Sequence, residues 1–169
     1  GPRSHRFEVG DRVAAIFFQN WLRGRAPQDA GDSALGGAVD GMLAQYVTLH
    51  EDGLVAIPHS LSYEQAATLP CAAVTAWSGL MRCGRLQAGD TVLLQGTGGV
   101  SVLGLQIAVA AGAHVYITSS SDQKLQLARS LGATGLINYR KHPDWQVVVR
   151  ELTHGHGADH VLEVGGSGT

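Results

Sequence analysis

The sequence predicts an α/β fold, in which a doubly wound parallel sheet follows a smaller, β-rich part. After residue 90, short apolar runs alternate with stretches of helical periodicity up to the end of the chain. The centres of these runs recur roughly every twenty residues, which is the spacing of right-handed strand–helix–strand units. A glycine-rich turn joins the first run directly to a helix, as is typical of such sheets.

Four parallel strands are expected in the second part of the chain: Thr91–Gln95, His114–Thr118, Gly135–Asn138 and His160–Val164. The helix over 100–111 carries apolar residues on every side, so we expect it to be buried, with Gly112 as a left-handed C-cap. A second helix runs from Asp122 to Gly132. A third, opened by Pro143, should bury one side through Trp145, Val148, Val149 and Leu152.

The first third of the chain is expected to be a small, incomplete β-subdomain. Strands are predicted at 11–17, 42–49 and 54–57, around a Gly-, Asp-, Ala- and Pro-rich stretch. A helix should begin at Ser62, kink at Pro70 and end near Gly84. These patterns divide the chain into a β-subdomain over 1–60, a connecting helical segment over 61–90 and the parallel sheet over 91–169.

Composition excludes several function classes. The 169 residues carry a net charge of −2, and no segment concentrates Lys and Arg, so a nucleic-acid or anionic membrane surface is not expected. No apolar run reaches the roughly 18 residues that span a bilayer. The two cysteines, Cys71 and Cys83, favour a reducing, cytoplasmic compartment.

The turn Gly96-Thr97-Gly98-Gly99 is the strongest candidate for a binding site. Gly96 would permit the tight turn, Gly98 would let the backbone approach a pyrophosphate, and the following helix would offer unpaired N–H groups. Ser101 replaces the third glycine of the G-x-G-x-x-G pattern, which predicts looser packing of helix on strand. The alternative is an ordinary strand–helix turn without a ligand.

Residues after the second strand bear on the choice of cofactor. A site that prefers NAD usually has an Asp or Glu here, whereas this chain has small hydroxyl side chains, among them Ser119 and Ser120. We expect Asp122 to serve as a dipole and capping residue of the next helix. Lys124 follows, and the combination favours NADP(H). Alternatively, Lys124 is a solvated helix residue.

Taken together, the motifs resemble the medium-chain dehydrogenase/reductase superfamily, and within it the zinc-independent, quinone-oxidoreductase-like and alcohol-dehydrogenase-like members. The resemblance implies a partial GroES-like β-domain followed by a partial Rossmann domain. It rests on the order of these segments: GDRV (10–13), DGMLAQYVTL (40–49), LPCAAVTAW (69–77), GDTVLLQGTGGVS (89–101), TSSSDQKLQLARSLGA (118–133), INYR (137–140) and DHVLEVGG (159–166).

The resemblance also implies roles for particular residues. The pyrophosphate would lie against Thr97, Gly98, Gly99 and Val100, and the 2′-phosphate end of NADPH against Ser119, Lys124 and Tyr139. Thr75 matches a position close to the nicotinamide, and Gly165 and Gly166 border the cofactor cleft.

A zinc ion is not expected. Cys71 matches a catalytic zinc ligand of zinc-containing members, but zinc needs further ligands that the family supplies from an N-terminal segment outside this chain. We therefore expect Cys71 to be a buried small thiol. His154, His156 and His160 have a chelating spacing but fall in a loop, where a structural role is favoured over a metal site.

These features indicate an NADP(H)-dependent oxidoreductase that moves a hydride to or from an alcohol, a carbonyl, a quinone or an enone. No residue is an obvious proton donor, and Tyr46, which could serve on chemistry alone, is expected to pack in a strand. The alternative is a cofactor-binding or structural fragment without turnover. We expect the last strand to leave an open edge, covered by homo-oligomerisation or by the rest of a longer chain, and the isolated chain to bind NADP(H) weakly.

Overall fold

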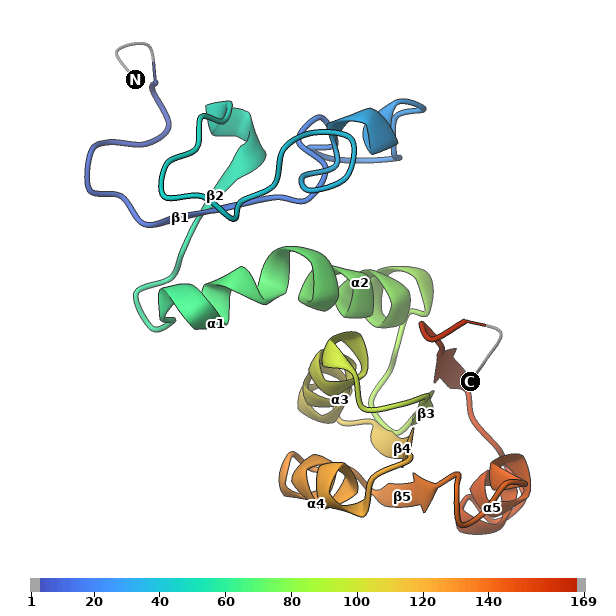
Figure 1. The fold of residues 1–169 in the computed structure, drawn as a ribbon. Coiled ribbons are helices and arrows are strands. Elements are labelled where there is room, and N and C mark those ends of the chain that lie inside the picture. Colours follow the sequence, from blue (N-terminus) through green and yellow to red (C-terminus); the bar gives the residue numbers. More distant parts are fainter. Residues whose placement is uncertain (1–3, 167–169) are drawn as a thin grey trace. The chain divides into compact units, whose positions relative to one another are not determined.

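A computed structural model describes residues 4–166 (Figure 1). The chain divides into two compact units, Gly1–Cys71 and Ala72–Thr169. Within residues 4–166, every helix is too short or too polar to cross a bilayer.

The first unit is built on a short antiparallel pair of strands. β1 (Val13–Ala15) pairs with β2 (Leu54–Ala56), and two 3₁₀ turns, η1 (Ala30–Ser33) and η2 (Glu51–Gly53), lie in the connection. The strand predicted at 42–49 is wrong: this stretch is irregular, and Leu43 and Tyr46 are almost fully exposed. A strand forms only where a neighbour completes its hydrogen bonds, and β1 and β2 pair with each other instead.

Glu51 anchors the start of the described chain. Its Oε2 accepts hydrogen bonds from the backbone N–H of Arg6, from the Ser4 hydroxyl and from the backbone N–H of His5. These donors, the Arg6 N–H first, lower the pKa of Glu51 to about 2. The carboxylate therefore holds the N-terminal segment against η2.

A broken helix connects residues 62 to 84. Ser62 and Gln65 form a capping box at the start of α1 (Tyr63–Ala67), as the sequence predicts. At Pro70 the helix widens into a π-helical segment, η3 (Leu69–Ala73), because proline lacks the N–H of a regular turn. It continues as α2 (Val74–Trp77) and a second π-helical segment, η4 (Ser78–Cys83). The regular helix is therefore interrupted near Pro70, as the sequence predicts.

The second unit contains a four-stranded parallel sheet in the order β5-β4-β3-β6, which confirms the predicted Rossmann-type topology. The strands are β3 (Thr91–Leu94), β4 (His114–Ser119), β5 (Gly135–Asn138) and β6 (His160–Leu162). Among the described strands, β5 and β6 form the two edges.

Helices cover both faces of this sheet (Figure 1). α3 (Gly99–Ala110) and α4 (Asp122–Ser130) pack on one face, and α5 (Trp145–Leu152) packs on the other. Alternate strand residues therefore belong to different cores. The first core contains Val92, Leu94, Val115, Ile117, Leu105, Ala108, Leu125 and Ala128, and the second contains Leu93, Tyr116, Ile137 and Val149.

Two expectations about helix burial are wrong. α3 is fully buried only along one stripe, which contains Ser101, Gly104, Leu105 and Ala108. Its other apolar residues are partly buried or exposed, because the sheet and α2 leave part of the helix surface uncovered. In α5, Leu152 is 41% exposed, whereas Val149 is buried and Trp145 and Val148 are partly buried. Leu152 is the last residue of α5, so no further helical turn covers it, although its Cδ1 would lie 3.4 Å from a Cβ on Gly135.

Candidate functional site: the turn after β3

The glycine turn leaves the sheet at the carboxyl end of β3, where ligands bind in parallel α/β sheets. Gly96 has a φ of +80°, which glycine adopts without strain. Just before it, the backbone N–H of Gln95 donates to the carbonyl of Leu162 over 3.1 Å. The Gly96 N–H donates to Thr118 Oγ1 over 2.9 Å. Both neighbouring strands therefore hold the root of the turn.

Ser101, in place of the third glycine, is buried and forms a specific contact. It is 1% exposed, and its hydroxyl donates to the carbonyl of Gln95 over 3.0 Å. Gly104, one turn further along α3, also lies close to the sheet: a Cβ there would lie 3.0 Å from Leu162 Cδ2. The buried hydroxyl of Ser101 is accommodated between helix and strand because it has an acceptor, while looser packing of the two stays a prediction.

No side chain among residues 4–166 caps the start of α3. Its N-cap is Gly98, which is exposed together with Gly99, whereas serines cap α1 and α4. A Cβ built on Gly98 would meet no heavy atom within 4 Å. The first N–H groups and the positive dipole end of α3 therefore face open space, which suits a phosphate.

The end of β4 lies beside this turn. Ser119 is 3% exposed, and its Oγ lies 2.8 Å from Thr97 Oγ1 and accepts from the Ser121 N–H over 3.3 Å. Ser120 is only partly buried. Ser121 caps α4 by accepting a hydrogen bond from the Lys124 N–H. The hydroxyls after β4 thus have different surroundings, which the sequence alone could not distinguish.

Asp122 is the first acidic residue after β4 in the sequence, and it is hydrogen-bonded to the end of β5 and to the loop after it. Its carboxylate accepts from Lys141 Nζ over 2.6 Å and from Asn138 Nδ2 over 2.8 Å. The Lys141 ammonium, followed by the Asn138 amide, lowers the pKa of Asp122. Ser121, rather than Asp122, is the side-chain cap of α4, because the hydroxyl of the residue before the helix reaches the N–H of its third residue.

The other expected site residues occupy neighbouring elements of the same unit. Tyr139 follows β5, is 40% exposed, and donates its backbone N–H to the Ser119 carbonyl over 3.2 Å. Lys124 is exposed on α4, and Thr75 is exposed on α2, which packs against α3. After β6, Glu163 Oε1 accepts from the N–H groups of Gly165 and Gly166.

Sequence reasoning missed two features of this site. One is Thr118, whose hydroxyl accepts the Gly96 N–H; the other is the group of Asp122, Asn138 and Lys141. Both could have been predicted from the sequence in the same way, because polar residues at the carboxyl ends of neighbouring parallel strands meet at one edge of a sheet.

Comparison with known proteins decides the family. The family model of zinc-binding dehydrogenases matches residues 99–169. A zinc-type alcohol dehydrogenase-like protein of Schizosaccharomyces pombe is 51% identical over 165 residues, covering 96% of this chain and 48% of that protein. The crystal structure of a Sinorhizobium meliloti 1021 protein, provisionally assigned as an alcohol dehydrogenase, matches with a TM-score of 0.92 and 49% identity, over 99% of this chain and 50% of that one.

The chain belongs to the medium-chain dehydrogenase/reductase superfamily. It spans about half the length of the curated relatives it matches. Solved structures of this superfamily that it resembles also include an enoyl reductase, CurK, with a TM-score of 0.75 and 30% identity over 96% of this chain and 42% of that one.

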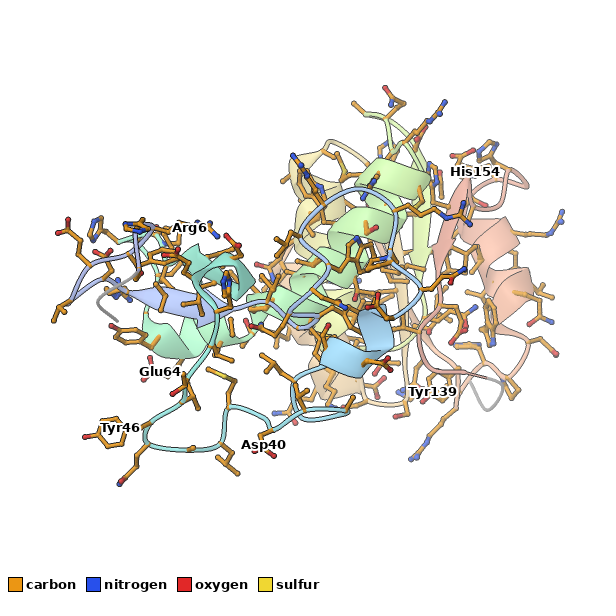
Figure 2. All side chains as sticks on the ribbon, turned by 90° about the horizontal axis from the view of Figure 1, so that it is seen from above. Arg6, Asp40, Tyr46, Glu64, Tyr139 and His154 are labelled. Atoms are coloured by element: carbon orange, nitrogen blue, oxygen red, sulfur yellow. The ribbon has the colours of Figure 1, made fainter. Side chains whose placement is uncertain are left out.

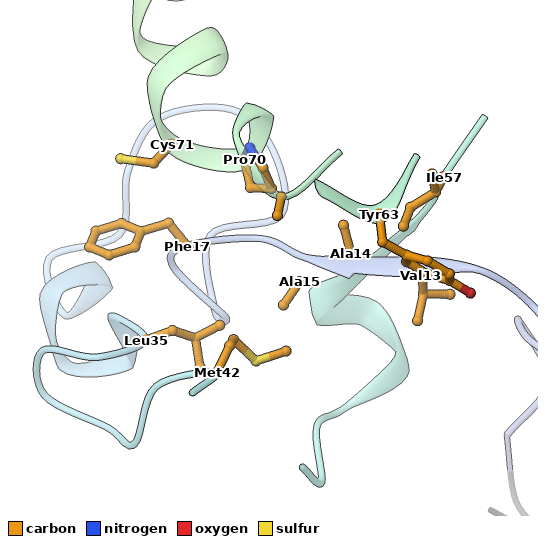
Figure 3. Close-up of a pocket in the computed structure, with 11 residues that line it drawn as sticks. Val13, Ala14, Ala15, Phe17, Leu35, Met42, Ile57, Tyr63, Pro70 and Cys71 are labelled. Carbon is orange, nitrogen blue, oxygen red and sulfur yellow. The ribbon is translucent and has the colours of Figure 1, made fainter. Parts of the chain in front are cut away.

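A separate apolar pocket of about 460 Å³ lies within the first unit (Figure 3). Phe17, Leu35, Met42 and Ile57 line it, with Tyr63 and Cys71 among the other lining residues. Cys71 is exposed, so the expectation of a buried thiol is wrong. The reason is its place in the π-helical segment after Pro70, where it reaches this pocket and not a core.

The described residues do not fit the zinc ion of the superfamily's zinc-containing members. Zinc takes three or four protein donors, and no three His, Cys, Asp or Glu side chains of residues 4–166 come together in a way that could hold a metal. His156 Nε2 lies 3.0 Å from Asp159 Oδ1, and His160 Nε2 lies 2.9 Å from Asp90 Oδ2.

Tyr46 is neither in a strand nor packed. It is 93% exposed in the irregular stretch before η2 and projects away from the ribbon (Figure 2). The expectation that it packs is wrong because the strand that would have oriented it does not form.

Proposed function

We propose that this chain is the nucleotide-binding part of an NADP(H)-dependent medium-chain oxidoreductase. The observation that carries the proposal is the uncapped start of α3 beside the turn at Gly96, at the carboxyl edge of a parallel sheet. Thr97, Gly98, Gly99 and Val100 would hold the pyrophosphate through backbone N–H groups. Because Gly98 and Gly99 have no Cβ, the phosphates can come close to the backbone there.

The bound nicotinamide would donate a hydride from its C4 atom to a carbonyl, quinone or enone, or accept one there from an alcohol. The protein's part is to orient the dinucleotide along the sheet edge. Thr75, on the helix that packs against α3, is proposed to lie near the nicotinamide, and Gly165 and Gly166 to border the cleft. Relatives named as alcohol dehydrogenases and as enoyl reductases support this range of substrates.

Charge at the end of β4 supports NADP(H) over NAD(H). Lys141 and Asn138 each engage one oxygen of the Asp122 carboxylate, and the Lys141 ammonium offsets its charge, which makes it a weaker partner for a ribose 2′-hydroxyl. Ser120 is partly exposed, and Lys124 and Tyr139 are exposed; the side chains of all three can donate to a 2′-phosphate. A solved structure with 37% identity is named an NAD-dependent alcohol dehydrogenase, which makes the preference a point to measure.

We also propose that the protein is cytoplasmic and that it assembles into homo-oligomers. Cys83 is an exposed thiol, which a reducing compartment would keep reduced. β6 is an edge strand with Val161 55% exposed, and exposed edges favour pairing or burial.

The test is calorimetric titration of the chain with NADPH and with NADH. We expect NADPH to bind more tightly, and Lys124→Ala to reduce the preference by about 1–3 kcal/mol, because a charge-assisted contact to the 2′-phosphate is lost. Arg129→Ala is the matched control, since it removes one positive charge from the exposed last turn of the same helix. Equal affinities for the two nucleotides would refute the preference, and no binding of either would refute the proposed function.

A further inference from the structure

The ladder between β3 and β4 ends before β4 does. Its register pairs Thr91–Leu94 with His114–Ile117, whereas β4 continues through Thr118 and Ser119, which pair with β5. At Gly96 the chain turns out of the sheet. On its β3 side the last part of β4 therefore faces the turn, while on its other side it stays paired with β5.

Beyond the last hydrogen-bonded pair of β3 and β4, two side-chain hydroxyls of β4 contact the turn. Thr118 Oγ1 accepts the Gly96 N–H over 2.9 Å, and Ser119 Oγ lies 2.8 Å from Thr97 Oγ1. Thr118 and Ser119 are 4% and 3% exposed, and both contacts are partly buried. Because successive side chains of a strand point to opposite faces, the two hydroxyls hold the turn at two separate points.

Ser119 is poorly placed to serve the 2′-phosphate as well. A hydroxyl has one donor and two acceptor sites, and Ser119 Oγ already meets Thr97 Oγ1 and the Ser121 N–H. Only a small fraction of the side chain is exposed. Ser120, the next residue, is less buried and offers a more accessible hydroxyl.

We propose that Thr118 and Ser119 are positioning residues, which hold the turn at Gly96 and Thr97 in the shape that receives a pyrophosphate. The proposal rests on the proposed nucleotide-binding function. Ser119 then holds the turn and does not contact the 2′-phosphate, as the family resemblance implies it would. Thr118, to which the resemblance assigns no role, holds the turn as well. Binding of NADPH and of NADH should depend on both hydroxyls equally, because the two nucleotides share the pyrophosphate.

The experiment compares Thr118→Val and Ser119→Ala with the unaltered chain for three ligands: NADPH, NADH and 2′-AMP, which has a 2′-phosphate but no pyrophosphate. We expect both variants to bind NADPH and NADH about 5- to 20-fold more weakly, the loss that one hydrogen bond explains, with the ratio of the two affinities unchanged. Binding of 2′-AMP, followed by NMR shifts, should not change. Thr118→Ser keeps the hydroxyl and should restore binding.

Lys124→Ala is the matched contrast, because it should weaken NADPH and 2′-AMP and spare NADH. If Ser119→Ala shows this same pattern, Ser119 contacts the 2′-phosphate and the proposal is overturned. Unchanged affinities in both variants overturn it too. If the unaltered chain binds none of the three ligands, the proposed function itself fails.

A measurement without nucleotide tests the structural step alone. Amide hydrogen exchange of Gly96 should become faster in Thr118→Val and return to the original rate in Thr118→Ser. The exchange of Leu93, inside the sheet, is the internal reference for folding. Exchange of Gly96 at the original rate in Thr118→Val would contradict the contact.

Discussion

Gly135, the first residue of β5, shows how a single missing side chain shapes the second core. A Cβ at this position would lie 2.7 Å from Cε1 of the Tyr116 ring. The Tyr116 hydroxyl donates to the carbonyl of Leu152 over 3.2 Å, so the ring is held at both ends and cannot easily move aside. The aromatic ring therefore requires glycine on the neighbouring strand.

We expect Gly135→Ala to lower the free energy of unfolding by about 1–3 kcal/mol, because the added methyl group overpacks the contact with Tyr116. Urea denaturation followed by circular dichroism measures the change. Gly98→Ala is the control from the same unit: φ is −78° there and no heavy atom lies within 4 Å of the added carbon. It should lower stability by no more than about 1 kcal/mol, because alanine is a poorer N-cap than glycine but meets no clash here. Equal stability of the two variants would show that the Tyr116 ring moves aside to accommodate the added methyl group.

At the scale of elements, carboxylates attach the edge strand β6. Asp159 Oδ2 accepts the Thr91 N–H over 2.8 Å, and Asp90 Oδ2 lies 2.9 Å from His160 Nε2. The pKa of Asp159 is lowered, mainly by the Thr91 N–H and then by His156. The pKa of Asp90 is lowered, mainly by the Gln87 N–H and then by His160. Both carboxylates thus support the start of β6 as long as they are ionised.

The pH dependence of this attachment follows from the direction of the shifts. A carboxyl group whose pKa is lower in the folded chain stabilises it above the ordinary value of 3.8, and this contribution is lost as the pH falls through the folded value. We expect the amides of β6 to lose exchange protection below about pH 4, before those of β4.

Asp159→Asn keeps an acceptor for the Thr91 N–H and removes the titration, so protection of β6 should vary less with pH in this variant. Asp144→Asn, an exposed residue that makes no cap contact with α5, is the control. If the amides of β4 and β6 lose exchange protection together at one pH, Asp90 and Asp159 do not stabilise the attachment of β6 specifically.

At the scale of the whole molecule, the metal content is open to a direct test. We expect the purified chain to retain no stoichiometric zinc after dialysis and to gain no stability when zinc is added. The reason is that no three potential ligands of residues 4–166, Cys71 included, come together. Elemental analysis measures the metal, with Cys83→Ala as the control for Cys71→Ala. One zinc per chain that is lost only in Cys71→Ala would contradict the expectation.

Much of the second unit could be predicted from the sequence because its signals are local. Apolar runs bounded by glycine gave β5 at its observed limits, and β3, β4 and β6 to within two residues. The positive φ of Gly112 and the cap at Ser62 also follow from residues adjacent in the chain. Strand–helix alternation then leaves few topologies, because crossover connections are right-handed.

Tertiary structure decided what depends on distant partners. The stretch 42–49 has strand-like composition but no pairing strand beside it, and Cys71 lies in a pocket wall that residues 13 to 57 help to form. Likewise, only the adjacency of β3, β4 and β5 brings Thr118 to Gly96 and Lys141 to Asp122. Periodicity reports which face of an element is apolar, but burial and hydrogen bonding depend on which residue lies opposite, and the chain determines that only by folding.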